Sequence, residues 1–198
     1  MAKANKVGFL GGTFDPIHFG HLQLAICAKE RYGFDKVLLC PAGLSPFKTH
    51  QVPRVSSHHR LTMTCLALDG LEGFFVCEEE IHKPGPSFTI ETLRRLQAKE
   101  PMSSFHVILG EDQLEGFSRW KQFQEIINHF RPVIGSRYSK TFHQTAYALE
   151  SKDFFAMNNL EISSTFIRDR LSKRLYCKHL MPPKVVDYIL EHKLYLTH

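Results

Sequence analysis

The stretch from Gly11 to His21, with the sequence GGTFDPIHFGH, constrains the fold of this chain more than any other segment. The apolar run Val7–Leu10 precedes it and predicts a buried strand, and the apolar segment Leu22–Ala28 that follows predicts a helix. The stretch is therefore expected to form a strand-to-helix turn. Such turns are where open α/β sheets bind their ligands.

Several features of this turn favour the binding of phosphate. The paired glycines Gly11 and Gly12 let backbone N–H groups approach a ligand closely. His18 and His21 lie three positions apart, so their side chains face the same way at the start of the helix. The free N–H groups and the positive dipole end of that helix point to the same place. Two alternatives stay open: that the glycines serve only a tight turn, and that the His-x-Gly-His segment forms one half of a metal site.

Composition and charge limit the class of protein. With 198 residues, 43% hydrophobic and 23% charged, the chain is expected to form a single domain over residues 1–198. No apolar segment is long enough to cross a membrane and no signal peptide is present, so a cytoplasmic location is expected. The five scattered cysteines are interpreted as reduced core residues. The net charge of +5 fits an anionic ligand, and no block of like charge forms a nucleic-acid-binding arm.

Strand and helix patterns alternate along the rest of the chain. Further strands are predicted at Lys36–Pro41, Phe74–Cys77, Phe105–Leu109, Pro132–Gly135 and Phe154–Met157. Helices are predicted at Arg60–Leu68 with Ser57 as cap, at Ile90–Leu96 with Ser87 as cap, at Phe123–Phe130, after Ile162, and from Pro182. His50, His58 and His59 are interpreted as solvated loop residues. The alternation predicts an α/β fold, a Rossmann-like doubly wound parallel sheet with helices on both faces and a small C-terminal helical part over about 160–198.

A second phosphate-binding pattern opens the helix that follows Ile162. Ser163 and Ser164 lie at the predicted helix N-terminus, and Arg168 follows about one turn later. Serine hydroxyls and free backbone N–H groups cradle phosphate oxygens, and an arginine adds charge and a planar fork. A plain helix cap with a surface arginine is the alternative.

Four further residues are candidates because of their position or chemistry. Asp112 closes a predicted strand, where a carboxylate accepts hydrogen bonds from ribose hydroxyls; a turn-initiating aspartate is the alternative. Trp120 either fills the core or stacks on a heteroaromatic ring. Lys48 and Arg137 lie in loops after strands and would otherwise be surface cations.

Together these motifs resemble the signature of the HxGH nucleotidyltransferase superfamily. Its pattern has Gly-Gly-Thr/Ser-Phe-Asp-Pro, then His-x-Gly-His, and an Ile-Ser-Ser-Thr-x-x-Arg segment near the C-terminus, and every position is matched. The segments Ser87–Leu93 and Gly110–Trp120 and the ending Val185–Tyr195 are similar to those of nicotinate-mononucleotide adenylyltransferases. The resemblance covers essentially the whole chain. It implies that the first strand and the strand ending at Gly110 flank the switch point of the sheet.

The resemblance implies an enzyme that joins ATP and nicotinate mononucleotide to give nicotinate adenine dinucleotide and pyrophosphate, a step of NAD biosynthesis. The attacking phosphate oxygen is already anionic, so no general base is needed, and Mg²⁺ is expected with ATP. The implied catalytic residues are His18, His21, Lys48 and Arg168. The implied ATP-binding residues are Gly11, Gly12, Thr13, Phe14, His18, His21, Asp112, Ile162, Ser163 and Arg168, and those for the mononucleotide are Asp15, Lys48, Thr89, Trp120 and Arg137. No residue is expected to bind a metal. Neither nucleic acid nor a membrane is expected as a partner, and homo-oligomerisation is left open.

The chain departs from the family pattern at three places. Phe88 replaces the usual tyrosine, Phe47 precedes Lys48 where a histidine is common, and Glu111 adds a negative charge beside Asp112. The open alternatives are another nucleotidyltransferase such as pantetheine-phosphate adenylyltransferase, a non-catalytic nucleotide- or RNA-binding module, and a histidine metal protein.

Overall fold

The structure is a computed structural model that describes residues 4–43, 53–83, 85–136, 149–158 and 160–196. Its strands are β1 (Lys6–Gly12), β2 (Lys36–Pro41), β3 (Phe74–Val76), β4 (Ser104–Gly110), β5 (Val133–Ser136) and β6 (Phe154–Ala156). Its helices are α1 (Phe19–Tyr32), α2 (Ser57–Leu68), α3 (Thr89–Lys99), α4 (Phe123–His129), α5 (Ser164–Ser172) and α6 (Pro183–Glu191). Two 3₁₀-helices, η1 (Glu111–Arg119) and η2 (Ser151–Asp153), complete the described elements. Strands and helices alternate as predicted.

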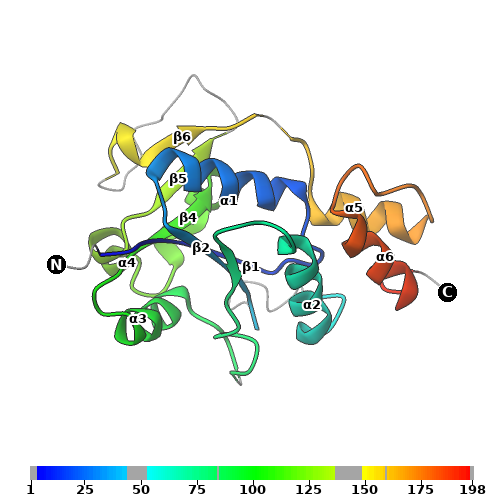
Figure 1. The fold of residues 1–198 in the computed structure, drawn as a ribbon, viewed down its shortest axis with the longest axis horizontal. Coiled ribbons are helices and arrows are strands. Elements are labelled where there is room, and N and C mark those ends of the chain that lie inside the picture. The colour runs from blue at the N-terminus through cyan, green and yellow to red at the C-terminus, as the bar shows by residue number, and fades with distance from the viewer. Residues whose placement is uncertain (1–3, 44–52, 84, 137–148, 159, 197–198) are drawn as a thin grey trace. The chain divides into compact units, whose positions relative to one another are not determined.

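The strands form a six-stranded sheet in the order β3-β2-β1-β4-β5-β6. The pairs β1–β4, β4–β5 and β5–β6 are parallel, and Val7 of β1 lies opposite Phe105 of β4. Figure 1 shows β4, β5 and β6 side by side in green and yellow. In this strand order the winding reverses between β1 and β4, which makes their boundary the switch point of a doubly wound sheet. The predicted fold class and switch point are confirmed.

The chain forms two compact units. The first unit contains residues 1–11, 23–38 and 88–159, and the second contains residues 12–22, 39–87 and 160–198. The expectation of one domain over residues 1–198 stays a prediction.

The core of the first unit is built on the central strands. Phe9, Ile108 and Ile134 of β1, β4 and β5 are fully buried. Continuous apolar runs are typical of parallel strands whose two faces are both covered. α3 buries Ile90 and Leu93 at helical spacing while its other face is charged, which explains why this segment is helical.

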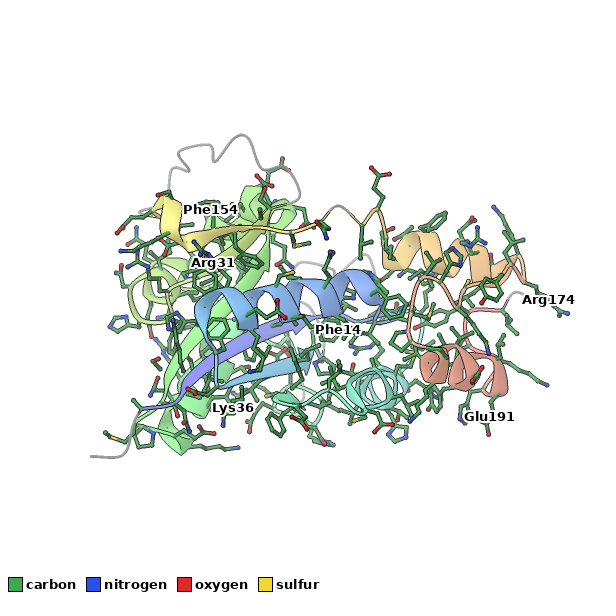
Figure 2. All side chains as sticks on the ribbon, turned by 45° about the horizontal axis from the view of Figure 1, so that its top comes forward. Phe14, Arg31, Lys36, Phe154, Arg174 and Glu191 are labelled. Carbon is green, nitrogen blue, oxygen red and sulfur yellow. The ribbon has the colours of Figure 1, made fainter. Side chains whose placement is uncertain are left out.

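The core of the second unit includes the C-terminal helical part. α5 and α6 lie side by side (Figure 1, orange and red). Figure 2, in which Arg174 and Glu191 are labelled near the ends of these helices, shows side chains filling the space between them. Ile167 of α5 and Val185 and Ile189 of α6 are buried. α6 also contacts α2.

The two predicted caps of α2 and α3 are each wrong by one residue. α2 begins at Ser57 and is capped by Ser56, whose side chain accepts a hydrogen bond from the His59 N–H at 3.3 Å. α3 begins at Thr89, and Ser87 is buried ahead of the helix instead of capping it. At α2 two adjacent serines have the same cap preference, and at α3 the residue before the first turn is Phe88, which makes no side-chain cap hydrogen bond, so tertiary packing decides where each helix begins.

The interpretation of the central histidines as loop residues is wrong for two of them. His58 and His59 lie in the first turn of α2. The Nδ1 atom of His59 lies 2.9 Å from the Tyr188 hydroxyl of α6, a contact that joins this turn to α6. Burial and His192 lower the pKa of His59. His50 lies outside the described residues.

The five cysteines are free thiols. Cys40, Cys77 and Cys177 are buried and Cys27 is half-buried, whereas Cys65 is exposed on α2. The expectation of core residues is therefore wrong for Cys65, because the buried face of α2 carries Met63, Thr64 and Ala67 instead. No helix in the described part of the chain is both long and apolar enough to cross a bilayer.

Candidate active site

The turn between β1 and α1 lies in the second unit and is closed around a buried ring. Phe14 is 1% exposed and has a positive φ of 49°, a left-handed conformation that is unfavourable for a phenylalanine. A Cβ atom at Gly12 would lie 2.5 Å from the Phe14 ring, so only glycine fits there. Strained backbone of this kind is characteristic of functional turns, where packing holds a conformation that the local sequence disfavours.

His18 and His21 face each other at the start of α1, as the spacing predicts. Their ring centroids are 3.7 Å apart in a stacked arrangement. The backbone N–H of His18 donates to Nδ1 of His21 at 3.3 Å. In a neutral ring whose Nδ1 accepts, the proton is on Nε2, so this contact makes Nε2–H of His21 a hydrogen-bond donor. The Phe14 ring packs edge-to-face against His21, with 5.0 Å between the ring centroids, and holds the His21 ring in place.

Gly20 makes room for the first imidazole. A Cβ atom at this position would lie 3.0 Å from Nδ1 and 3.1 Å from Cε1 of His18, and 3.7 Å from the Ile162 carbonyl oxygen. The glycine of the His-x-Gly-His pattern is thus explained by packing against the histidine ring. His18 is 5% exposed, so its position depends on these close neighbours.

Asp15 is buried in the same turn and both of its carboxylate oxygens accept hydrogen bonds. The Tyr195 hydroxyl donates to Oδ1 at 2.7 Å, and the Arg54 backbone N–H donates to Oδ2 at 2.9 Å. The backbone carbonyl of Asp15 accepts from Nη1 of Arg168 at 2.7 Å. Asp15 is 5% exposed, and the predicted contact of its side chain with the mononucleotide stays a prediction.

The second motif is joined to the first by hydrogen bonds across a long sequence separation. Ser163 caps α5 as predicted, with its side chain accepting from the Phe166 N–H at 3.1 Å. The Ser164 hydroxyl donates to the Pro16 carbonyl at 2.9 Å, although the two residues are 148 positions apart. The N-terminus of α5 therefore lies against the turn that carries the histidines. Ile162, just before α5, is buried.

Arg168 is held at the junction of these two motifs. Besides its bond to Asp15, its Nη2 donates to Oγ1 of Thr165 at 3.0 Å. The side chain retains 27% of its accessible surface, so part of the guanidinium reaches solvent. A partly exposed, oriented guanidinium beside two helix N-termini is a suitable site for phosphate.

Arg60 is a residue of this site that the sequence does not reveal. It is 1% exposed and donates to the Thr13 carbonyl at 2.7 Å and to the Gly43 carbonyl at 3.1 Å. Burial lowers the pKa of its guanidinium, and the negative charge of Asp15 opposes that shift. Arg60 thereby fixes the backbone at the ends of both β1 and β2. An arginine on an amphipathic helix resembles any surface cation, so no sequence signal was available.

The first unit carries the predicted residues Thr89, Asp112 and Trp120, as well as Gly11 near the end of β1. Asp112 follows β4 in the first turn of η1, and its Oδ1 lies 2.5 Å from the place that a Cβ of Gly110 would take, so the carboxylate folds back over that glycine. Trp120 ends η1, half-buried, with its ring edge-to-face with Phe117 at 5.3 Å. Thr89 is the first residue of α3.

The family departures have local partners in this unit. Phe88 packs beneath the Lys121 ammonium group, which lies 4.5 Å from its ring centroid. Glu111 accepts a hydrogen bond from the Ser136 hydroxyl. Lys48, its neighbour Phe47, and Arg137 lie outside the described residues, and their predicted roles stay predictions.

The second unit thus brings together an anion-binding set. The set consists of two stacked imidazoles, the first turns of α1 and α5, and the Arg168 guanidinium. Hydrogen bonds from Ser164 to Pro16 and from Arg168 to Asp15 join the two segments that carry them. The His21 ring, the helix N-termini and Arg168 can donate hydrogen bonds, and the Arg168 guanidinium carries positive charge, which suits the binding and transfer of phosphoryl-containing groups. Among the described residues no group of three or more His, Cys, Asp or Glu side chains is placed to hold a metal ion.

The sequence matches known proteins along nearly its full length. The pattern of the cytidylyltransferase-like family matches residues 9–170. A protein of Methylacidiphilum infernorum named as a probable nicotinate-nucleotide adenylyltransferase is 34% identical over 96% of this chain and 92% of its own length. A protein of the same name from Dictyoglomus thermophilum is 35% identical over 96% of this chain and all of its own length.

Solved structures agree on the fold. The nicotinic acid mononucleotide adenylyltransferase of Plasmodium falciparum, complexed with NaAD, superimposes with a TM-score of 0.76 over 96% of this chain and 97% of its own. The sequence identity is 18%, so this likeness concerns the fold.

Proposed function

This chain belongs to the cytidylyltransferase-like family and, within it, to the nicotinate-nucleotide adenylyltransferases, and on that premise we propose which residues carry the reaction. The enzyme transfers the adenylyl group of ATP to nicotinate mononucleotide, giving nicotinate adenine dinucleotide and pyrophosphate. The single observation that carries the assignment of residues is the joining of the two phosphate motifs in the second unit, by the bonds Arg168–Asp15 and Ser164–Pro16.

The reaction requires charge neutralisation and alignment more than proton transfer. A phosphate oxygen of the mononucleotide attacks the α-phosphorus of ATP, and pyrophosphate leaves. The nucleophile is anionic at neutral pH, so the protein does not have to deprotonate it. Two polyanions have to meet in line, and the charge that builds up in the transition state has to be stabilised.

In the second unit, His18, His21 and Arg168 are the groups proposed to stabilise that charge. Nε2–H of His21 donates to a phosphate oxygen, and the exposed part of the Arg168 guanidinium binds the triphosphate. Gly12, Thr13 and Phe14, together with Ser163, offer backbone N–H groups to ATP. Lys48 is proposed as a further phosphate cation. Mg²⁺ enters as part of the substrate, with oxygen ligands from the triphosphate and water.

In the first unit, Asp112 is proposed to bind ribose hydroxyls and Trp120 to stack on a heteroaromatic ring, because a partly accessible carboxylate and indole suit these contacts. Arg137 is proposed as a cation for the mononucleotide. The contact of Asp15 with the mononucleotide stays a prediction, and its buried carboxylate accepts two protein hydrogen bonds. A cytoplasmic location and self-association stay predictions.

Thr89 is proposed to recognise the carboxylate of nicotinate. It is the first residue of α3, so its backbone N–H has no partner within the helix. A carboxylate placed there gains a charge-assisted hydrogen bond and the favourable helix end. The amide of nicotinamide mononucleotide lacks the charge, so we expect a preference for the acid of about tenfold to a hundredfold in kcat/KM.

The experiment measures pyrophosphate release from ATP with nicotinate mononucleotide, nicotinamide mononucleotide and phosphopantetheine as acceptors. Activity with phosphopantetheine alone would refute the substrate assignment, and no release with any acceptor would favour a non-catalytic binding module.

Two variants of Thr89 test how the acid is chosen. Thr89→Pro removes the backbone N–H at the first helical position, where proline is well tolerated. Phe88 before it has φ −115° and ψ 124°, which is compatible with a following proline. The control Thr89→Ala keeps the N–H. Loss of acid preference in Thr89→Pro but not in Thr89→Ala is expected, and equal preference in both would refute the role of the N–H.

A further inference from the structure

The C-terminal segment reaches the first phosphate motif through one hydroxyl group. Tyr195 donates to Oδ1 of Asp15 at 2.7 Å, across 180 positions in the sequence. Burial and the adjacent carboxylate raise the pKa of the Tyr195 hydroxyl well above its ordinary value, so it stays protonated as a donor. The bond is therefore a neutral donor on a buried anion, a strong type of hydrogen bond.

This bond affects which oxygen of Asp15, the backbone carbonyl or the carboxylate, binds Arg168. Nη1 of Arg168 lies 2.7 Å from the backbone carbonyl of Asp15 but 3.9 Å from its Oδ2. A carboxylate attracts a guanidinium more strongly than a neutral carbonyl does. Here the carboxylate is occupied instead by the Tyr195 hydroxyl and the Arg54 N–H. The guanidinium keeps the neutral acceptor, and its charge is not compensated by a direct bidentate ion pair.

Two arginines interact electrostatically with the pair Asp15–Tyr195. Arg60 from α2 and Arg168 from α5 face Asp15, and both interact electrostatically with it or with Tyr195. The carboxylate is thus the local anion between two arginines, of which Arg60 is buried and committed to two carbonyl groups. Arg168 is the one of the two that retains solvent exposure.

We propose that Tyr195 is a positioning residue that occupies the Asp15 carboxylate and so keeps the Arg168 guanidinium available for the triphosphate of ATP. The proposal rests on the function assigned above to Arg168. Without the hydroxyl, Oδ1 of Asp15 lacks a donor, and the carboxylate turns toward the nearest cation. Arg168, whose Nη1 now lies 3.9 Å from Oδ2, then forms a closer, hydrogen-bonded ion pair in the free enzyme that ATP has to break.

The test is a mutant cycle with ATP kinetics on the full chain. Tyr195→Phe removes the hydroxyl and keeps the ring, and we expect it to raise KM for ATP about tenfold while kcat changes less than threefold, because ground state and transition state lose the same contact. In an Asp15→Asn background the side chain at position 15 has no charge to capture Arg168, so adding Tyr195→Phe should change KM for ATP less than twofold. Tyr176→Phe, at an exposed tyrosine of the same unit, is the matched control.

Each outcome decides the proposal. An unchanged KM in Tyr195→Phe, or an equal rise in both backgrounds, would overturn it, since the second result describes a purely structural contact. If Tyr195→Phe fails to fold, Asp15→Asn alone decides. In Asp15→Asn, the proposal expects KM for the mononucleotide to stay within threefold of the parent. A large selective rise in that KM would show that Asp15 binds the mononucleotide itself, which overturns the proposal. Arg168→Ala separates the two levels: an unchanged KM for ATP there refutes the assigned function of Arg168, whereas a raised KM there with a normal Tyr195→Phe refutes only the positioning role.

Discussion

Replacing Gly20 by alanine is expected to separate the stability of this enzyme from its activity. The new methyl group would lie 3.0 Å from Nδ1 and 3.1 Å from Cε1 of His18, well inside the usual carbon contact distance of about 3.5–4.0 Å. The ring cannot simply move aside, because it is stacked on His21 at 3.7 Å. Both imidazoles therefore shift by several tenths of an ångström.

Two opposing terms set the stability of the Gly20→Ala variant. Gly20 lies in the first turn of α1, and alanine is more favourable than glycine in a helix by about 0.8–1.0 kcal/mol. Crowding a packed side chain costs about 1–3 kcal/mol. The net change in the free energy of unfolding should therefore be a loss of less than about 2 kcal/mol, so that the variant remains folded.

The rate should respond more strongly than the stability. A displaced donor to the transition state loses much of its effect, and misplacement of reacting groups by about 1 Å can cost on the order of a hundredfold. For a shift of part of that distance we expect kcat to fall about tenfold to a hundredfold. Steady-state pyrophosphate release gives kcat, and urea unfolding monitored at Trp120 gives the stability.

A second background tests whether His18 transmits the effect. In His18→Ala the ring is absent, so adding Gly20→Ala should cost no further activity and should slightly stabilise the helix. The reasoning fails if Gly20→Ala keeps kcat within twofold of the parent, or if it lowers kcat equally in both backgrounds.

Three further predictions follow from the same contacts. His18→Ala and His21→Ala are each expected to lower kcat by about 10²–10³ with little change in unfolding midpoint, and a loss of only a few-fold would exclude that histidine as a phosphate ligand. Arg168→Lys should be impaired in KM for ATP, because an ammonium group cannot reproduce the planar fork that bonds Asp15 and Thr165 together with phosphate; a fully active variant would show that charge alone suffices. Burial, with Lys6 and Arg131 nearby, lowers the pKa of His106 in the folded protein, so its contribution to stability is complete above the unfolded value of about 6.5 and declines as the pH falls below it. Urea unfolding between pH 7.5 and 5.5 should accordingly show a smaller loss of stability in His106→Gln than in the parent, and equal losses would refute the assignment.

Local chemistry explains what the sequence by itself determined. The glycine pair with Asp15-Pro16, the spacing of His18 and His21, and the serine cap of α5 are each specified within a few neighbouring residues. Turn preference, helical periodicity and capping act over that range, so the alternation of strands and helices and both phosphate motifs could be predicted, whereas the place of the switch point came from the family resemblance. The exact caps of α2 and α3 could not, because Ser56 and Ser57 have equal preferences and because α3 begins after Phe88, which has no capping side chain.

Tertiary structure alone decided how the second unit supports its motifs. Arg60 lies 47 positions from Thr13, and Tyr195 lies 180 positions from Asp15. Neither residue differs in local pattern from a surface arginine or a C-terminal tyrosine. Their roles arise from burial: away from water, a guanidinium has to find carbonyl groups and a carboxylate has to find donors, and the folded chain determines which ones are within reach.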